Sequence, residues 1–333
     1  MSEFAPIIRR IGPADRARIA TVEAMQLIQW LERCEALGVD PSALRAAAGV
    51  RETQLADPES RVPWHAFLSM IQAAERLACD PLIALRAGVS RPPRGVLVYQ
   101  SRAQGTLREA LAELERNAAL AADPVHLEVR EEPRTAWLRL GVDEPDVDAA
   151  RPAREYLAGF MVRFLAEVLG SFQPRQVGFP HAQRGPLSEY ERLLGAPVRF
   201  RQSDCAIGFA RDLLDEPLPV ANPVVARLLA EKIELSRARR GAGELRASTA
   251  LALERLLREN QSIGREAVAR RLGLSVRTLQ RRLGVERTTF RAVSDDVRRQ
   301  AATTLLAIPE LSLVAVAQRL RFKDEDAFAK AWK

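Results

Sequence analysis

The chain has 333 residues, which is enough for two domains with separate hydrophobic cores. With 47% hydrophobic and 28% charged residues it has the composition of a globular protein, and no apolar run near its start is long enough for a secretory signal or a transmembrane span. Its three cysteines are scattered without metal-ligand spacing, so reduced thiols in the cytoplasm are expected, with no metal site.

Residues 1–20 are predicted to form a flexible leader. From residue 21, apolar side chains recur three and four positions apart, which is the spacing of an amphipathic helix. Asp40 followed by Pro41, with Gly49 further on, supplies an N-cap, a first-turn proline and a terminating glycine for a short helix. Patterns of these kinds predict a loop over 91–95 and helices over 21–38, 40–49, 63–78, 80–88 and 106–122.

Apolar and polar side chains alternate over residues 125–130 and 135–140, and a polar turn with a proline separates them, so a β-hairpin is predicted. An acidic loop follows. Further elements are predicted as a helix over 152–171, a helix over 187–194, and short strands over 176–180, 198–201 and 206–209. Residues 21–235 are therefore predicted to form an α+β domain with a helical start and a small, mostly antiparallel sheet.

A stretch of small, glycine-bearing and basic residues, 236–246, marks the joint between this domain and the rest of the chain. Such a composition is typical of an interdomain linker that can also touch phosphates, and a frayed helix end is the alternative interpretation. The remaining residues, 247–333, are predicted to form an all-α domain.

Residues 263–284 are predicted to form two short helices joined by a tight turn. Ala269 is small where a second helix must approach, and Gly273 supplies a left-handed position that ends the first helix. Ser275 is placed to cap the second helix, and Leu279 fixes that helix to the core. This is a helix-turn-helix pattern, in which the second helix enters the major groove of DNA. For this stretch by itself, a helical hairpin inside some all-α domain is the alternative.

A second copy of the pattern follows after a long predicted helix over residues 288–307. In residues 312–333, Ser312 caps a first helix, Asp324 caps a second, and Phe328 anchors the second to the core. At 1.5 Å per residue, the helix between the copies spans roughly 30 Å, close to one turn of B-DNA. Two such copies on one rod could enter successive major grooves from one side.

The net positive charge of the chain lies in its last quarter. Residues 244–333 contain 18 lysines and arginines against 11 acidic residues, whereas the first 243 residues contain 32 of each. A basic domain beside a neutral one is expected of a phosphate-binding module attached to another domain. Solubility alone is the alternative explanation, and it does not require this asymmetry.

With these features, the chain from about residue 245 onward resembles the DNA-binding domain of the AraC/XylS family of bacterial transcription regulators. The matching segments are 274–283, 289–292, 296–299, 311–317 and 321–322. The family usually has Gly-Phe where this chain has Arg321 and Phe322, so the second turn is expected to carry roughly 1 kcal/mol of strain. The family also continues further, and the C-terminal end at Lys333 is therefore interpreted as truncated.

The front domain has a resemblance of its own, spread over residues 20–230. It is similar to the arabinose-binding-type N-terminal domain of one branch of AraC-like regulators, and the most distinctive match runs from Phe200 to Pro223. The other matching pieces are 48–49, 55–58, 61–63, 80–81 and 106–111. The resemblance implies a domain that senses a small effector or dimerises, and it does not imply a sugar ligand.

The residues expected to contact DNA lie on the second helix of each copy. Arg277, Gln280 and Arg281 are predicted at base edges, because arginine donates to guanine and glutamine pairs with adenine. Thr278 and Arg282 are predicted near phosphates. The candidates in the second copy, where the family usually has glutamine and arginine, are Glu325, Asp326 and Lys330. With its added negative charge, the second copy is expected to touch mostly backbone or to bind weakly.

No catalytic or cofactor-binding constellation is predicted. His65, His126 and His181 are far apart and none has a second ligand at helical spacing, so packing or surface roles are expected instead of metal or haem binding. Five aromatic residues could line an apolar pocket but are interpreted as core, namely Trp64, Trp137, Tyr156, Phe160 and Phe164. The chain is therefore not expected to be an enzyme, and no cofactor is expected.

The sequence is interpreted as a one-component transcription regulator that binds double-stranded DNA. The other expected partners are a small-molecule effector of unknown identity and site, a second copy of the chain, and RNA polymerase, but not a membrane. Two alternatives remain. One is a ligand- or partner-binding protein whose truncated rear domain no longer binds specific DNA, and the other is a sensor enzyme with a cryptic site in the front domain.

Overall fold

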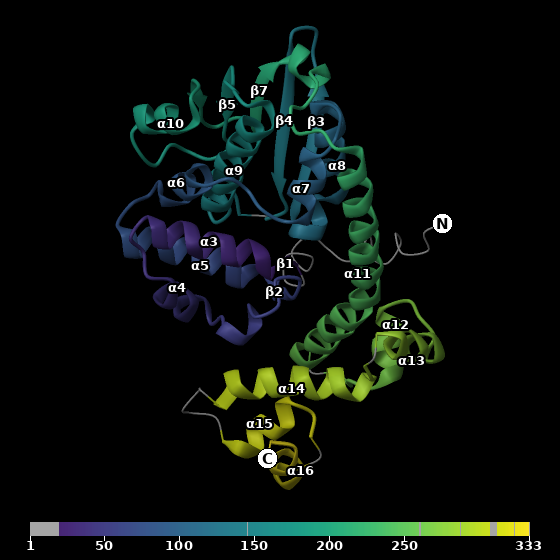
Figure 1. The fold of residues 1–333 in the computed structure, drawn as a ribbon. Coiled ribbons are helices and arrows are strands. Elements are labelled where there is room, and N and C mark those ends of the chain that lie inside the picture. Colours follow the sequence, from purple (N-terminus) through teal and green to yellow (C-terminus); the bar gives the residue numbers. More distant parts are fainter. Residues whose placement is uncertain are drawn as a thin grey trace. The chain divides into compact units, whose positions relative to one another are not determined.

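The computed structural model describes residues 20–144, 146–259, 261–286, 288–306, 312–322 and 324–332. These residues form two compact units that divide between Ser236 and Arg237. We call residues 20–236 the front unit and residues 237–332 the rear unit (Figure 1). The predicted leader lies outside the described residues except for its last residue, Ala20, which is buried and whose carbonyl accepts from the Trp64 amide at 2.8 Å.

The front unit begins with a strand, so the prediction of a helix from residue 21 is wrong for its first three residues. Strand β1, Thr21–Glu23, pairs antiparallel with β2, Arg61–Pro63. The Arg61 guanidinium donates to the Thr21 carbonyl at 2.9 Å and to Asp123 at 2.7 Å. Asp123 lies 102 positions from Thr21 in the sequence. The spacing of apolar residues near Thr21 therefore could not predict that Asp123 and Arg61 stabilise a strand there.

The helical start of the front unit is confirmed. Its predicted helices are α3 (Ala24–Ala36), α4 (Pro41–Ala48), α5 (Trp64–Ala78), α6 (Ile83–Ser90) and α8 (Leu107–Ala121). The Asp40 side chain accepts from the Ser42 amide at 2.9 Å, and Gly49 ends α4 with a φ of 65°. Helices η1 (Glu52–Gln54) and α7 (Val96–Arg102) are among the elements that were not predicted.

The main sheet has five strands in the order β3-β4-β7-β5-β6. The strands are β3 (Val125–Glu131), β4 (Thr135–Val142), β5 (Gln176–Gly178), β6 (Val198–Arg199) and β7 (Cys205–Ala210). The predicted hairpin is confirmed as β3 and β4, and every neighbouring pair is antiparallel except β5 with β6, which is parallel. Helix α10 (Leu187–Leu194) lies between β5 and β6 in the chain, and η2 (Arg211–Asp215) follows β7.

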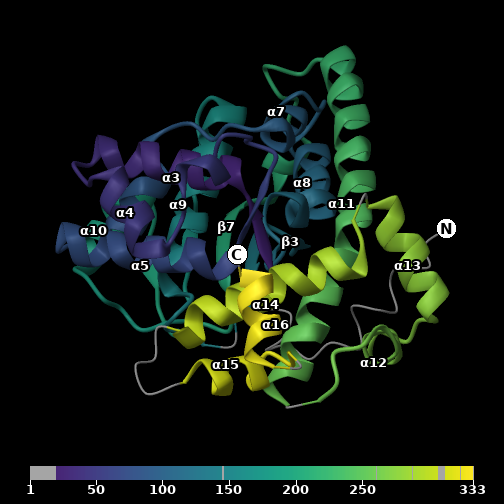
Figure 2. The same cartoon turned by 90° about the horizontal axis from the view of Figure 1, so that it is seen from below.

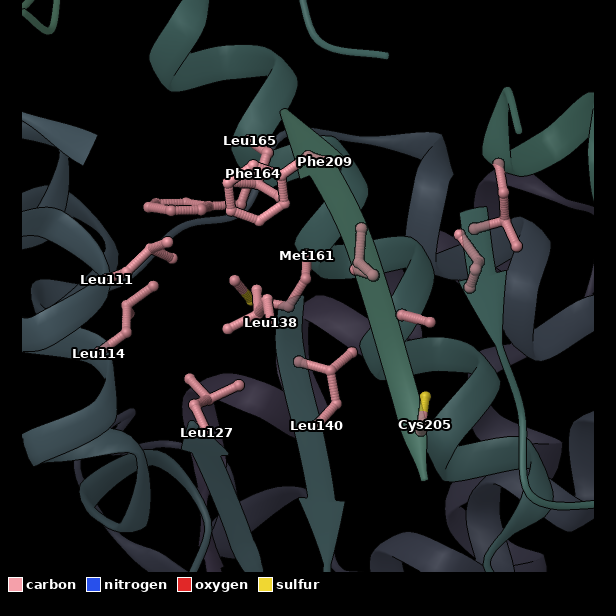
Figure 3. Packing of buried hydrophobic residues seen from close by; sticks show 14 of the residues in the cluster. Leu111, Leu114, Leu127, Leu138, Leu140, Met161, Phe164, Leu165, Cys205 and Phe209 are labelled. Carbon is pink, nitrogen blue, oxygen red and sulfur yellow. The ribbon is translucent and has the colours of Figure 1, made fainter. Parts of the chain in front are cut away.

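Helices α8 and α9 (Arg151–Leu169) cover the sheet and build the first core of the front unit. Figure 3 shows Leu114 of α8 near Leu127 and Leu138 of the hairpin, with Met161 of α9 beside them. A second core lies among α3, α5 and α6, where Trp30 packs edge-on against Tyr156 of α9 at 5.0 Å. Helix α9 therefore belongs to both cores.

The regular elements of the rear unit are all helices within its described residues. Helix α11 (Pro223–Arg258) begins in the front unit and contains the predicted linker, residues 236–246. The helices that follow are α12 (Arg265–Arg271), α13 (Val276–Val285), α14 (Phe290–Leu306), α15 (Leu313–Arg319) and α16 (Glu325–Trp332). Figures 1 and 2 show α12 and α13 near one end of α14, with α15 and α16 alongside it. None of the described helices has the length and apolar character needed to cross a membrane.

Helices α6 and α9 pack with their backbones in contact at two glycines. A Cβ built on Gly88 would lie 2.5 Å from the Tyr156 carbonyl oxygen, and one on Gly159 would lie 2.9 Å from the Leu85 carbonyl oxygen. Arg33 strengthens the same joint, because its guanidinium donates to the Ala87 and Gly88 carbonyls at 2.8 Å each. The last turn of α6 thus receives a positive charge at its negative end.

We predict that Gly88→Ala destabilises the front unit by about 1–3 kcal/mol, because the added methyl group meets backbone that cannot rotate away. Gly284→Ala is the matched control. A Cβ at that helical position meets nothing within 4 Å, so the same substitution should stabilise the rear unit by about 0.5–1 kcal/mol. Urea unfolding followed by circular dichroism measures both changes. Equal effects of the two substitutions would contradict this packing.

Candidate nucleic-acid interface and ligand cavity

The helix pair α12/α13 is held by a tight turn and an apolar seam. Gly273 has a φ of 68°, and the Leu274 amide donates back to the Ala269 carbonyl at 2.9 Å, which closes the end of α12. Ser275 accepts from the Thr278 amide at 3.1 Å and so caps α13. Leu279 of α13 is fully buried and Ala269 of α12 is 2% exposed. One face of α13 is therefore packed against the core.

The opposite face of α13 presents three long polar side chains. Arg277, Gln280 and Arg281 are exposed, and among the described residues none of them has a hydrogen bond or ion pair. Thr278 and Arg282 lie at the margin of this face and are half-buried, and the Thr278 hydroxyl is 2.9 Å from the Ser275 hydroxyl. The exposed face therefore carries two cationic donors and one amide that are free to bind another molecule.

The pair α15/α16 repeats this arrangement. Ser312 accepts from the Ala315 amide at 3.2 Å, and Asp324 accepts from the Ala327 amide at 2.8 Å, so both helices are capped. Phe328 is 5% exposed and packs edge-on against Phe322, with ring centroids 5.5 Å apart. The second pair thus has its own small core.

The candidate residues of α16 differ in charge from those of α13. Glu325 and Asp326 are exposed in the first turn of α16, where acidic side chains favour the positive end of the helix. The Lys330 side chain lies outside the part of the chain that the structure describes. The described part of this face is therefore acidic, in contrast to α13.

The two turns close in the same way although their sequences differ. The Phe322 amide donates to the Ala317 carbonyl at 2.9 Å, as Leu274 does to Ala269 in the first pair. Arg321 occupies the left-handed position that Gly273 fills in the first turn, with a φ of 60°. A residue with a Cβ in this conformation costs about 1–2 kcal/mol, so the second turn is strained.

Helix α14 joins the pairs, and Arg298 is a residue of this joint that the sequence analysis missed. Its guanidinium lies 4.7 Å from the centroid of the Phe322 ring and donates to the Leu320 carbonyl at 3.2 Å. The first half of α14 contributes Val293 and Val297 to the core of the first pair, and Ala302 belongs to the core of the second. Arg298 lies in the family-matching segment 296–299, but nothing in the sequence distinguishes it from the neighbouring Arg299, which is exposed.

The front unit contains a cavity of about 130 Å³ between its two cores. The walls come from α3, α5, α8, β3 and α9, and Leu114, Leu127 and Met161 among its lining residues are labelled in Figure 3. Ile233 and Ser236 of α11 complete one wall. The aromatic residues here were predicted to belong to the core. Trp64 and Tyr156 are buried and Phe160 is half-buried, and all three line the cavity.

Polar groups at this cavity are incompletely satisfied. The Tyr156 hydroxyl and the Trp64 Nε1 are buried without a hydrogen-bond partner. Glu23 also lines the cavity, and burial raises the pKa of its carboxyl group to about 7. Its neighbour Glu59 forms an ion pair with Lys232 of α11. Buried polar groups without partners are uncommon in folded proteins, so this is a candidate ligand site.

A second buried polar cluster ties α9 to α5 and α10. Arg151 contacts Glu155 at 3.0 Å and Glu75 at 2.7 Å, and the Tyr190 hydroxyl donates to Glu155 at 2.5 Å. Burial raises the pKa of Glu155 to about 7 and lowers the pKa of His181, 3.6 Å away, to about 4. Within the described residues, no group of three or more metal-ligating side chains is found. This cluster is a structural tie between helices.

The chain is similar to a known protein family over most of its front unit and to known transcription regulators over both units. The family described as the N-terminal arabinose-binding domain of AraC transcription regulators matches residues 38–218. The ornithine utilization regulator of Pseudomonas aeruginosa is 26% identical over 325 residues, which are 96% of this chain and 94% of that protein. The HTH-type transcriptional regulator VirS of Mycobacterium tuberculosis is 29% identical over 169 residues, which are 50% of this chain and 49% of VirS.

A solved structure, that of the transcriptional regulator CdpR from Pseudomonas aeruginosa, is 24% identical in sequence and covers 87% of this chain and 92% of its own. The TM-score between the two structures is 0.44. The family match covers more than half of the chain.

We predict that Arg321→Gly is more stable than Arg321→Ala by about 1 kcal/mol, because glycine adopts the left-handed conformation without a Cβ clash and alanine does not. The comparison removes the arginine side chain from both variants. Urea unfolding of the two proteins measures the difference. An alanine variant as stable as the glycine variant would show that the turn is not strained.

The Glu23 carboxyl predicts a pH-dependent stability. Its pKa of about 7 in the folded protein lies above the usual 4.5, so its favourable contribution is complete below pH 4.5 and is lost as the pH rises through 7. We therefore expect Glu23→Gln to raise the melting temperature, relative to the natural chain, by a few degrees more at pH 8 than at pH 5. Glu155 also has a raised pKa, but it is present in both proteins, so its contribution cancels in the difference between their melting temperatures. A larger gain at pH 5 would contradict the assignment.

Proposed function

This chain belongs to the AraC transcription regulators with an arabinose-binding-type N-terminal domain, and we propose that it binds a specific DNA sequence under the control of a small molecule. Its relatives in the comparison are named as regulators, and it is a transcription regulator. Membership of such a family points to binding, not to catalysis, as its activity. In the proposal the rear unit binds DNA and the front unit binds the effector.

The pairs α12/α13 and α15/α16 are proposed to be two helix-turn-helix motifs. The observation that carries this proposal is α13, which buries Leu279 and leaves Arg277, Gln280 and Arg281 exposed and without partners in the described residues. A helix of this kind fits the major groove, where arginine can bind guanine and glutamine can bind adenine through two hydrogen bonds each. Thr278 and Arg282, at the margin, are proposed to face phosphates.

The two motifs are proposed to contribute unequally. Helix α14 has 17 residues and so spans roughly 25 Å, which is somewhat less than one turn of B-DNA at about 34 Å. Glu325 and Asp326 would face phosphates with the wrong charge, so α16 is expected to contribute little sequence recognition. Most base contacts are therefore assigned to α13.

The charge distribution supports DNA as the partner. The last 90 residues carry the whole formal excess of +7, while the preceding residues are balanced. Each phosphate neutralised by the protein lowers the slope of log affinity against log salt concentration by about 0.9. Sequence-independent contacts of this kind are proposed for exposed arginines outside α13, including Arg299.

The front unit is proposed to bind the effector in its cavity. Helix α11 supplies Ile233 and Ser236 to the cavity wall and continues to Arg258. A bound effector would therefore contact the helix that leads into the rear unit. Lys232 on the same helix forms an ion pair with Glu59 beside the cavity. A second copy of the chain and RNA polymerase are proposed as further partners of a regulator of this type.

We predict that Arg281→Ala changes the preferred DNA sequence at one base pair and weakens binding to the preferred duplex by about 1–3 kcal/mol. Selection of bound duplexes from randomised DNA measures the preference. Arg130→Ala is the control, because Arg130 is an exposed arginine on the hairpin of the front unit. An unchanged preferred sequence in the Arg281 variant would exclude this residue from base recognition.

Arg299→Ala should behave differently, because a phosphate contact carries no sequence information. We expect it to weaken specific and random duplexes about equally and to reduce the salt slope by about 0.9. Fluorescence anisotropy with both duplexes at several salt concentrations measures this. A loss confined to the specific duplex would assign Arg299 to base recognition instead.

A further inference from the structure

We propose that the cavity of the front unit binds a small, mostly apolar primary amine that also carries one oxygen, with its ammonium group at Glu23. The proposal rests on the effector role of the front unit for its regulatory meaning, and the binding itself is a property of the cavity. Three features of the described residues carry it: the size and lining of the cavity, two buried polar atoms without partners, and an uncompensated carboxyl group.

The volume and walls select a small, apolar body. At about 130 Å³ the cavity is close in size to an engineered apolar cavity of about 150 Å³ that binds benzene. Leu114, Leu127, Phe160 and Met161 from three different elements line it. A drug-sized molecule would need a cavity of at least about 300 Å³, so a ligand of roughly six to ten non-hydrogen atoms fits better.

Two buried donors select an oxygen on the ligand. Tyr156 is 6% exposed and Trp64 is 2% exposed, and neither the Tyr156 hydroxyl nor the Trp64 Nε1 has a hydrogen-bond partner. Both residues line the cavity. An indole nitrogen can only donate, so it requires an acceptor, and a hydroxyl or carbonyl oxygen in the cavity supplies one.

The charge at the cavity selects an amine over an acid. Arg94 lines the cavity and forms an ion pair with Glu32. Lys232, the residue before Ile233 of the cavity wall, forms an ion pair with the lining residue Glu59. The Glu23 carboxyl group has no hydrogen bond or ion pair within the described residues. The lining charge without a direct partner is thus a carboxylate, and an ammonium group is its complement.

The ionisation of Glu23 makes this binding depend on pH. Its pKa is about 7, and burial is the largest cause of the rise. Arg61 and Lys232 lower the pKa, while Glu59 and Asp57 raise it. An alkylammonium group, like that of lysine, keeps its proton up to about pH 10. Between pH 6 and pH 8 only the carboxyl group therefore changes, and the amine should bind more tightly as Glu23 ionises.

The test uses four six-carbon compounds that differ only at their ends: 6-aminohexan-1-ol, hexylamine, hexan-1-ol and 6-hydroxyhexanoate. Isothermal titration of the full chain at pH 8 should show 6-aminohexan-1-ol binding at least tenfold more tightly than hexan-1-ol or 6-hydroxyhexanoate, and more tightly than hexylamine. Glu23→Gln should abolish the preference for the amines. Glu52→Gln, at a side chain that is 86% exposed and outside the cavity, should retain it.

The natural chain provides a second measurement that needs no variant. The affinity for 6-aminohexan-1-ol should fall about tenfold from pH 8 to pH 6, as Glu23 takes up a proton, while that for hexan-1-ol should stay constant. Ala118→Phe, which fills the cavity from α8, should abolish binding of all four compounds. Absence of binding, equal affinity for the acid and the amine, or an unchanged preference in Glu23→Gln each overturns the proposal.

DNA binding is measured on the same preparation, so that the two proposals can fail separately. A chain that selects a DNA sequence but does not bind the amine contradicts the ligand assignment alone. A chain that binds the amine at Glu23 but shows no selective DNA binding contradicts the proposed regulator mechanism alone.

Discussion

The rear unit depends on the burial of one side of α13. Leu279 and Leu283 are fully buried against residues of α11, α12 and α14, and this fixes the rotation of the helix about its own axis. Once these two positions face the core, the side chains of Arg277 and Arg281 must face solvent, because they lie on the opposite side of a helix with 3.6 residues per turn. Packing therefore creates the cationic face, and the cap at Ser275 sets where that face begins.

The front unit has a different constraint, the close contact of α6 with α9. Gly88 and Gly159 let the two backbones touch. The Arg33 guanidinium donates to a carbonyl in the last turn of α6, and its Cζ lies 5.5 Å from the centroid of the Phe160 ring. Because α9 belongs to both cores, the cavity forms where the cores meet and are not fully interlocked. Helix α11 forms part of its wall, which places the end of the front unit at the candidate ligand site.

Features coded by neighbouring residues could be predicted from the sequence, such as the cap at Asp40, the alternation of the hairpin and the left-handed Gly273. Features that depend on distant residues could not. Strand β1 is stabilised by Arg61 and Asp123, which come from distant parts of the chain. Arg298 binds the Leu320 carbonyl, at the end of α15, only once the chain has folded. Core packing was preferred to a pocket for the aromatic residues, because a buried tyrosine that packs and one that lines a cavity look alike in a sequence. Base contacts by α13 remain predictions.

The central claim is that α13 binds the major groove. Its most direct test replaces Gln280 with a photoreactive amino acid and irradiates the protein with its selected, unmodified duplex. The account predicts a cross-link from position 280 to bases of that sequence, and none from a probe at position 100, since Gln100 is buried in the front unit. Cross-links that appear only from positions outside α13 would contradict it.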